Sequence, residues 1–220
     1  MSADPVARAL AAQAKALAEA AGGGTPWYWA PPLAADFTDI DGNIDNPTLV
    51  DDADVGLLFK VPNPAGGDWR WAVKSIPSAA GDWTYSLRVS TLAVDADGDC
   101  IMGIALRDST DPIRLLLVGV NRNGGFVYQV SEPGSGGSVT SDVSLTKWTG
   151  VGEYWFRAQH IASTSKMLYS ISVDGKIWTP MIEKNDSDLF DNAPDMIGVG
   201  AYYNRTTYPG GLSCSALIAG

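Results

Sequence analysis

The sequence predicts an all-β protein, an antiparallel sandwich preceded by one short α-helix. Three observations indicate this fold class. Short runs rich in β-branched and aromatic residues follow one another from Phe37 onward, turn sequences such as Asp97-Gly98 and Asp174-Gly175 separate them, and no helical periodicity appears after residue 30. Many short strands without crossover helices are typical of an antiparallel sandwich or barrel.

Residues 1–21 are expected to form the helix, from about Pro5 to Ala21. The segment is rich in alanine, the strongest helix former. Asp4 and Pro5 are typical of a helix start, and Gly22 is typical of a helix end. A seam with coiled-coil spacing runs through Val6, Leu10, Gln13, Leu17 and Ala20.

So short a helix is marginal alone in water, so it must dock on another surface. One alternative is an amphipathic helix packed on its own domain. We favour an oligomerising or anchoring helix, because Gly22–Gly24 forms a flexible hinge behind it. Residues 22–35 are read as a linker, in which the Trp27–Trp29 aromatic cluster and the stiff Pro31-Pro32 pair follow the hinge.

Residues 36–220 are read as one β-sandwich. In WTYSLRVS, Trp83, Tyr85, Leu87 and Val89 share one strand face, and the polar residues between them share the other. YSISVDGKIWTPM is read as a hairpin with a tight Asp-Gly turn. The expected strands are Leu57–Pro62, Trp69–Ile76, Trp83–Val94, Cys100–Arg107, Ile113–Asn121, Phe126–Ser131, Val139–Leu145, Tyr154–Ile161, Met167–Val173, Ile177–Ile182, Ile197–Tyr203 and Leu212–Ile218.

The order of these motifs resembles a concanavalin A-like lectin/glucanase jelly roll. The resemblance is carried by WRWAVKSIP, WTYSLRVSTLAV, CIMGIALRD, IRLLLVGVN, EYWFRAQHI, LYSISVDGKIWTPM and MIGVGAYYN, and it covers roughly residues 36–220. The SVDGKIW and IGVGAYY motifs are similar to the laminin-G-like and glucanase-like branches of that superfamily. The resemblance implies an antiparallel jelly-roll β-sandwich, and fold alone does not imply function.

Charge and composition exclude several classes of partner. The formal net charge is -10, which disfavours nucleic acids and anionic membrane surfaces. No apolar stretch is long enough to span a bilayer, and charged residues interrupt the N-terminal segment, so we expect neither membrane insertion nor a signal peptide. Cys100 and Cys214 are expected to be buried free thiols.

The sequence does not point to an enzyme. Glycosidases of the resembled fold carry a Glu-x-Asp-x-Glu strand, which this chain lacks, and its four glutamates lie far apart in sequence. His160, the single histidine, is read as a structural strand residue, because no Gly-x-Ser-x-Gly nucleophile motif accompanies it. A glycoside hydrolase with an unrecognised carboxylate pair stays as an alternative.

No cofactor and no metal site are expected. Two acidic runs, Asp39–Asp45 and Asp95–Asp99, suggest calcium, since the resembled superfamily often binds this ion. An EF-hand loop that started at Asp39 would need a glycine and a glutamate where the chain has Ile44 and Val50. Solvated Asp-Gly turns are therefore preferred, with calcium as the second alternative.

Two aromatic groups are candidate carbohydrate sites. Tyr203, Asn204, Arg205 and Tyr208 crowd one expected loop, where planar rings and hydrogen-bonding groups suit a sugar. Trp69 and Trp71 share one strand face and come next, although paired tryptophans more commonly pack in a core.

These observations favour a non-catalytic virion protein, a phage fibre or spike that displays a lectin-like domain to surface glycans. The N-terminal helix would form a homo-oligomer, with a trimer favoured, or fit a virion socket. The alternatives are a bacterial carbohydrate-binding protein outside any virion and the glycoside hydrolase named above.

Overall fold

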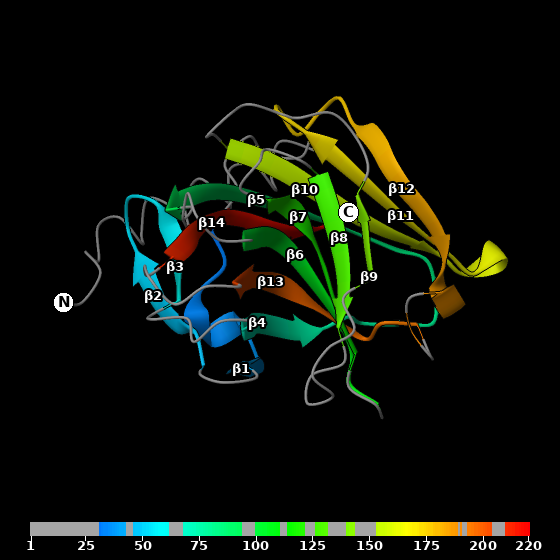
Figure 1. Ribbon diagram of the computed structural model, residues 1–220, viewed down its shortest axis with the longest axis horizontal. Coiled ribbons are helices and arrows are strands. Elements are labelled where there is room, and N and C mark those ends of the chain that lie inside the picture. The colour runs from blue at the N-terminus through cyan, green and yellow to red at the C-terminus, as the bar shows by residue number, and fades with distance from the viewer. Residues whose placement is uncertain are drawn as a thin grey trace, which may run out of the picture.

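Two antiparallel sheets of seven strands each pack face to face in the computed structural model (Figure 1). The structure describes residues 31–42, 46–61, 68–93, 100–110, 114–121, 126–131, 140–143, 153–188, 190, 193–203 and 210–220. The expected all-β sandwich is confirmed for this part of the chain. The predicted N-terminal helix, including Val6, Leu10, Gln13, Leu17 and Ala20, lies outside the described residues, as does most of the 22–35 linker.

The two sheets are named here by their strand order. Sheet I has the order β1-β4-β13-β6-β7-β8-β9. Its strands are β1 (Asp39–Gly42), β4 (Asp68–Ser75), β13 (Met196–Tyr203), β6 (Cys100–Asp108), β7 (Arg114–Asn121), β8 (Phe126–Ser131) and β9 (Thr140–Val143). Sheet II has the order β12-β11-β10-β5-β14-β3-β2. Its strands are β12 (Thr179–Asn185), β11 (Lys166–Ser172), β10 (Glu153–Ile161), β5 (Trp83–Ala93), β14 (Gly210–Ala219), β3 (Gly56–Val61) and β2 (Thr48–Asp52).

The main hydrophobic core lies between the sheets. Sheet II contributes large side chains such as Phe59, Leu87, Phe156 and Tyr169, and sheet I contributes residues such as Ile104, each with a relative exposure of 0%. Because strand side chains alternate between faces, each contributing strand turns its other set outward. In the described residues, the short 3₁₀ helix η1 (Ala34–Asp36) precedes β1, η2 (Ala162–Thr164) connects β10 and β11, and η3 (Asp186–Asp188) follows β12.

The twelve expected strands all occur, as β3 to β14. β8 has the expected bounds, and the ends of the others differ from expectation by at most three residues. Two further strands were not expected. β1 lies in the acidic run proposed for calcium and pairs with β4, and β2 pairs with β3. Both are short, aspartate-containing edge strands, and charged residues at sheet edges weaken the hydrophobic pattern by which a strand is recognised.

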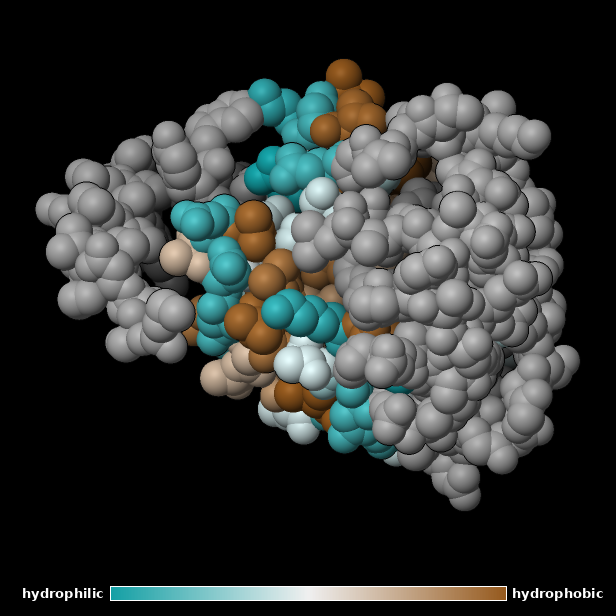
Figure 2. Space-filling view, turned by 60° about the vertical axis from the view of Figure 1, so that its left-hand side comes forward, coloured by the Kyte–Doolittle hydropathy of each residue, from teal (hydrophilic) through white to brown (hydrophobic). Residues whose placement is uncertain are grey.

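The described surface has few large exposed hydrophobic residues. On the side of the molecule brought forward in Figure 2, hydrophobic residues lie among hydrophilic ones. The exposed large hydrophobic residues of the described chain are Leu33, Val55, Val173 and Ile177. The last two belong to the connection between β11 and β12, which also forms part of the site described below. Within the same residues, no helix has both the length and the apolar character to cross a membrane.

Candidate functional site

The candidate site lies on the outer face of sheet II, opposite the core. The odd-numbered residues Trp83 to Val89 of β5 are buried in the core, as their alternation predicts. The even-numbered residues Thr84, Ser86 and Arg88 therefore face outward. A strand with this pattern supplies a row of hydroxyl groups and one guanidinium to the outer surface.

Strand β10 lies beside β5 and adds larger polar groups to the same face. The antiparallel register places Arg157 opposite Ser86 and Gln159 opposite Thr84. Arg157 Nε donates to Ser86 Oγ at 3.2 Å, and Gln159 Nε2 donates to Thr84 Oγ1 at 3.2 Å. These cross-strand hydrogen bonds fix the two long side chains over the sheet.

The connection between β11 and β12 spans six residues, 173–178, and is longer than the tight Asp-Gly turn expected from the sequence. Asp174 organises it. Its Oδ1 accepts hydrogen bonds from the backbone N–H groups of Lys176 and Ile177, at 2.8 and 2.9 Å, and from Ser172 Oγ at 2.9 Å. These bonds lower the pKa of Asp174 from 3.8 to about 2. The Asp174 carboxylate thus accepts hydrogen bonds from two backbone amides that, in a tighter turn, would donate to the opposite strand.

Gly175 brings this connection close to the sheet. Its φ is +72°, a left-handed conformation that favours glycine, and a Cβ at this position would lie 2.8 Å from the Trp155 ring. Trp155 is buried with 6% exposure, although its neighbours Tyr154 and Phe156 occupy the core face. The 173–178 connection therefore folds over the outer face of the sheet and packs its backbone on Trp155.

Arg157 and Trp178 form the most distinctive contact of the site. The Arg157 guanidinium carbon lies 3.7 Å from the centroid of the Trp178 ring, a cation–π stack. Burial lowers the pKa of Arg157 from its ordinary value. Arg88, farther along the same face, instead pairs with Glu153 and lies 5.8 Å from the centroid of the Trp155 ring.

These elements enclose a groove of two connected parts. The larger part has a volume of about 460 Å³, and the smaller, of about 220 Å³, shares Thr84 and Gly220 with it. The larger part is lined by Thr84, Ser86, Trp155, Arg157, Gly175, Lys176, Trp178, Ile218, Ala219 and Gly220. Its volume lies within the range of about 300–1,000 Å³ that is usual for small-molecule sites. We refer to the two parts together as the sheet II groove.

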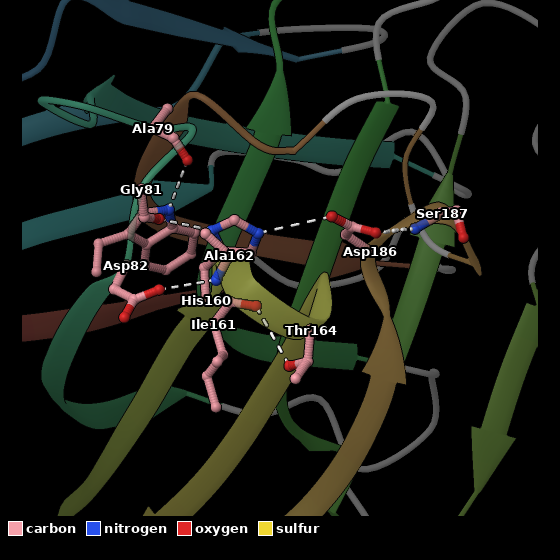
Figure 3. A network of polar contacts seen from close by, with 10 residues as sticks. Ala79, Gly81, Asp82, His160, Ile161, Ala162, Thr164, Asp186 and Ser187 are labelled. Atoms are coloured by element: carbon pink, nitrogen blue, oxygen red, sulfur yellow. Dashed lines mark hydrogen bonds and ion pairs between the residues drawn. The ribbon is translucent and has the colours of Figure 1, made fainter.

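His160 lines the smaller part of the groove and is 4% exposed. It belongs to a network of polar contacts (Figure 3). Its Nδ1 lies 2.8 Å from the carbonyl oxygen of Gly81, which can only accept, so Nδ1 carries the proton. Its Nε2 lies 3.6 Å from Asp186 Oδ2. Beside it, Asp82 Oδ1 accepts a hydrogen bond from the Ala162 amide at 2.8 Å. The expected structural role of His160 agrees with these contacts, which connect the start of β5 to the ends of β10 and β12.

Trp69 and Trp71 do not line the groove. They retain 3% and 2% exposure in a second hydrophobic cluster, which lies on sheet I. Trp69 contacts Tyr202 with ring centroids 4.9 Å apart, and the Arg107 guanidinium lies 5.3 Å from the Trp71 ring centroid. The prediction that these two tryptophans bind a sugar is therefore corrected: they are core residues, because burial leaves no indole face accessible to a ligand.

The other sequence-based candidates lie largely outside the described residues. Tyr203 ends β13, its side chain is outside the description, and Asn204, Arg205 and Tyr208 fall in the 204–209 gap. The sheet II groove is built from other residues than these candidates. In the sequence, the groove residues of β5 form the polar half of an alternating pattern, and Gly175, Lys176 and Trp178 belong to the SVDGKIW motif. Neither pattern shows that these residues lie next to each other in the fold.

Within the described chain, no group of histidine, cysteine, aspartate or glutamate residues has an arrangement that could hold a metal ion. In the first acidic run, Asp39 of β1 forms an ion pair with Arg107 of β6. Asp45 and the run Asp95–Asp99 lie outside the described residues. Cys214 is a buried free thiol, and burial raises its pKa to about 12.

Comparison with known proteins establishes the fold alone. No family model matches the sequence, and no curated protein matches it. A legume lectin-like domain from Entamoeba histolytica superposes with a TM-score of 0.55 and 11% identity, covering 85% of this chain and 91% of that one. A functionally unknown protein from Saccharomyces cerevisiae gives a TM-score of 0.53 and 13% identity over 86% of this chain and 98% of that one.

A weaker similarity links the chain to a phage protein. The CBM2 module of the evolved Dit of Lactobacillus casei BL23 phage J-1 matches with a TM-score of 0.46 and 10% identity, over 74% of each chain. This score is too low to support a conclusion about the present protein. The chain therefore shares the β-sandwich fold of a legume lectin-like domain, and its function has to be argued from its own groove.

Proposed function

We propose that the protein is a non-catalytic, lectin-like adhesion module that binds saccharides in the sheet II groove. The observation that carries the proposal is the Arg157–Trp178 stack, which lies beside the paired side chains of Ser86, Thr84 and Gln159 in one groove. Sugars present both apolar ring faces and many hydroxyls, and this groove offers an indole together with amide, hydroxyl and guanidinium groups. The fold shared with a legume lectin-like domain supports the proposal by analogy.

The lining favours binding over hydrolysis. A retaining glycosidase needs two carboxyl groups about 5 Å apart, one as nucleophile and one as acid/base. Among the residues that line the two parts of the groove, Asp82 is the single acidic side chain, and its Oδ1 accepts the Ala162 amide hydrogen. A glycoside hydrolase stays the alternative from another class, and release of reducing sugar from a polysaccharide panel by the full chain would establish it.

Binding is tested on a glycan array with the parent chain, Trp178→Ala and the control Val55→Ala. Val55 is exposed in the β2–β3 turn, at the opposite edge of sheet II from β12. Loss of an aromatic ligand platform costs about 2 kcal/mol, so we expect Trp178→Ala to weaken binding roughly thirtyfold. Val55→Ala should bind as the parent does. Equal binding by the parent and a folded Trp178→Ala variant would place saccharide recognition outside this groove.

The proposed biological setting is display on a virion, as the head of a phage fibre or spike. The support is the coiled-coil seam from Val6 to Ala20, followed by the Gly22–Gly24 hinge. A helix of this kind gathers several heads, a trimer being favoured, and repeated weak sites gain avidity. The alternative is a bacterial saccharide-binding protein outside any virion.

Light scattering on the full chain and on a chain that starts near Pro31 tests this assembly. We expect the full chain to be a symmetric oligomer, or to bind a larger particle, and the shortened chain to be a monomer. Two equal monomer masses, together with no binding to a particle, would exclude the proposed assembly while leaving saccharide binding by the groove unaffected.

A further inference from the structure

The larger part of the sheet II groove carries basic side chains, although the protein is acidic overall. The chain carries 25 acidic and 15 basic residues and a formal net charge of -10. Among the described residues that line the larger part, the charged side chains are Arg157 and Lys176, and the smaller part adds Asp82. A neutral saccharide needs no such local reversal of charge, whereas an anionic one does, because the remainder of the surface would repel it.

Arg157 is held in place without a counter-charge. Its Nε donates to Ser86 Oγ, and its guanidinium plane stacks on Trp178. In the described part of the chain no carboxylate pairs with it, and its Nη atoms donate to no protein acceptor. Burial lowers its pKa from its ordinary value, because the charged form has lost water.

Arg88 shows the alternative arrangement on the same face. Arg88 lies opposite Trp155, two register pairs along from Ser86, which lies opposite Arg157. Its guanidinium forms an ion pair with Glu153, and both side chains are partly exposed. One arginine on this face is thus neutralised by the protein, and the other is fixed in the groove with its terminal nitrogens available to a ligand.

Lys176 supplies a second cation at the rim. Its backbone amide is fixed by Asp174 Oδ1, and the residue itself is exposed. Asp174 Oδ1 accepts hydrogen bonds from two backbone amides and from Ser172, and the Asp174 carboxylate also interacts electrostatically with Lys176. The ammonium group of a lysine acts as a point charge that attracts an anion over a longer range, whereas the planar guanidinium fork matches a carboxylate with two parallel hydrogen bonds.

We infer that the sheet II groove selects saccharides that carry a carboxylate, such as uronic or sialic acids, with Arg157 binding the carboxylate and Trp178 lying beside the sugar ring. This inference rests on the proposed function and names the ligand class of the same groove. The stack places the Arg157 guanidinium beside the Trp178 indole. An acidic sugar has a carboxylate that complements the guanidinium and an apolar ring face that complements the indole.

The test compares acidic sugars with the same sugars made neutral. Calorimetric titration of the full chain uses oligosaccharides that contain glucuronate, galacturonate, mannuronate or N-acetylneuraminate, each beside its methyl ester. We expect at least one acid to bind roughly tenfold to a hundredfold more tightly than its ester, because a charge-assisted hydrogen bond is worth that much. Raised salt should weaken binding of the acid and leave the ester unchanged.

Three variants assign the effect to residues. Arg157→Gln should abolish the preference for acid over ester, and Lys176→Gln should reduce it severalfold. Arg88→Gln, the matched control whose cation is already paired, should leave it within about twofold. Lys176 is exposed in the 173–178 connection, so its variant tests the inference even if Arg157→Gln does not fold.

The outcomes separate this inference from the proposed function. If no acid binds better than its ester, but Trp178→Ala weakens binding to neutral sugars, the ligand class is wrong and the groove is still a saccharide site. Unchanged acid preference in folded Arg157→Gln and Lys176→Gln also overturns the inference. If no saccharide of either kind binds, the proposed function fails as well.

Discussion

The guanidinium of Arg157 lies on the indole of Trp178, with 3.7 Å between its carbon and the ring centroid, although the two residues come from different elements of sheet II. Arg157 belongs to β10, and Trp178 ends the connection that leads into β12. β11 lies between these strands in the sheet, so the contact crosses its outer face. The stack thus couples the connection to the sheet and shapes one wall of the groove.

This coupling is measurable as a stability difference. In a double-mutant cycle of Arg157→Gln and Trp178→Ala, we expect an interaction free energy of about 0.5–2 kcal/mol in urea unfolding. The control cycle joins Trp178→Ala with Val55→Ala, at opposite edges of sheet II, and should be additive within about 0.5 kcal/mol. Additivity in both cycles would mean that the stack contributes nothing to folding.

Gly175 should tolerate no side chain. Gly175→Ala places a Cβ in a left-handed backbone conformation and 2.8 Å from the Trp155 ring, so we expect a loss of about 1–2 kcal/mol or more and a Tm lower by roughly 2–8 °C. Gly220→Ala, on the opposite wall of the groove, is the control, because the nearest atom to its Cβ would be 3.6 Å away. Equal melting temperatures for the two variants would contradict the close packing of the connection on Trp155.

The sequence predicted the layers of the fold better than it predicted the groove. The period of two in β5 identifies the core face from Trp83 to Val89, because burial on one face needs only local alternation. The groove depends on contacts between distant segments: Arg157 and Ser86 are 71 positions apart. No local pattern specifies which strands become neighbours, so the polar residues Thr84 and Gln159 could be assigned to an outer face but not to each other.

The tryptophans show a related limit of the sequence pattern, which does not reveal whether a strand face is buried. Trp69 and Trp71 alternate as an exposed platform would, yet both are buried in a second hydrophobic cluster with residues such as Val73 and Tyr202. Trp178 falls in the expected strand Ile177–Ile182, but the structure starts β12 at Thr179, and Trp178 lines the groove. Alternation shows that residues share a face and does not show whether that face is covered.

Asp174 should make the 173–178 connection sensitive to acid. Its folded pKa, about 2, is lower than its ordinary value of 3.8, so its contribution to stability is present above pH 3.8 and is lost as the pH falls through about 2. Asp174→Asn keeps the shape and removes the charge. We expect it to be less stable than the parent at pH 6 in urea unfolding, and the difference to shrink steadily between pH 4 and pH 2. A difference that stays constant with pH would show that the charge of Asp174 is irrelevant.

His160 should contribute stability through the proton on Nδ1. His160→Phe preserves a planar ring beside Trp83, whose ring centroid lies 5.7 Å away, but removes the donor to the Gly81 carbonyl. A buried acceptor that loses its partner costs about 1–3 kcal/mol, which lowers the Tm of a chain of this size by roughly 2–12 °C. Gln159→Leu is the control, since Gln159 is the next residue along β10 and faces outward, where its loss removes one partly exposed hydrogen bond. The two variants are compared by thermal unfolding at neutral pH. If His160→Phe melts no lower than Gln159→Leu, the contacts in Figure 3 do not secure the end of the groove, and His160 is a replaceable core residue.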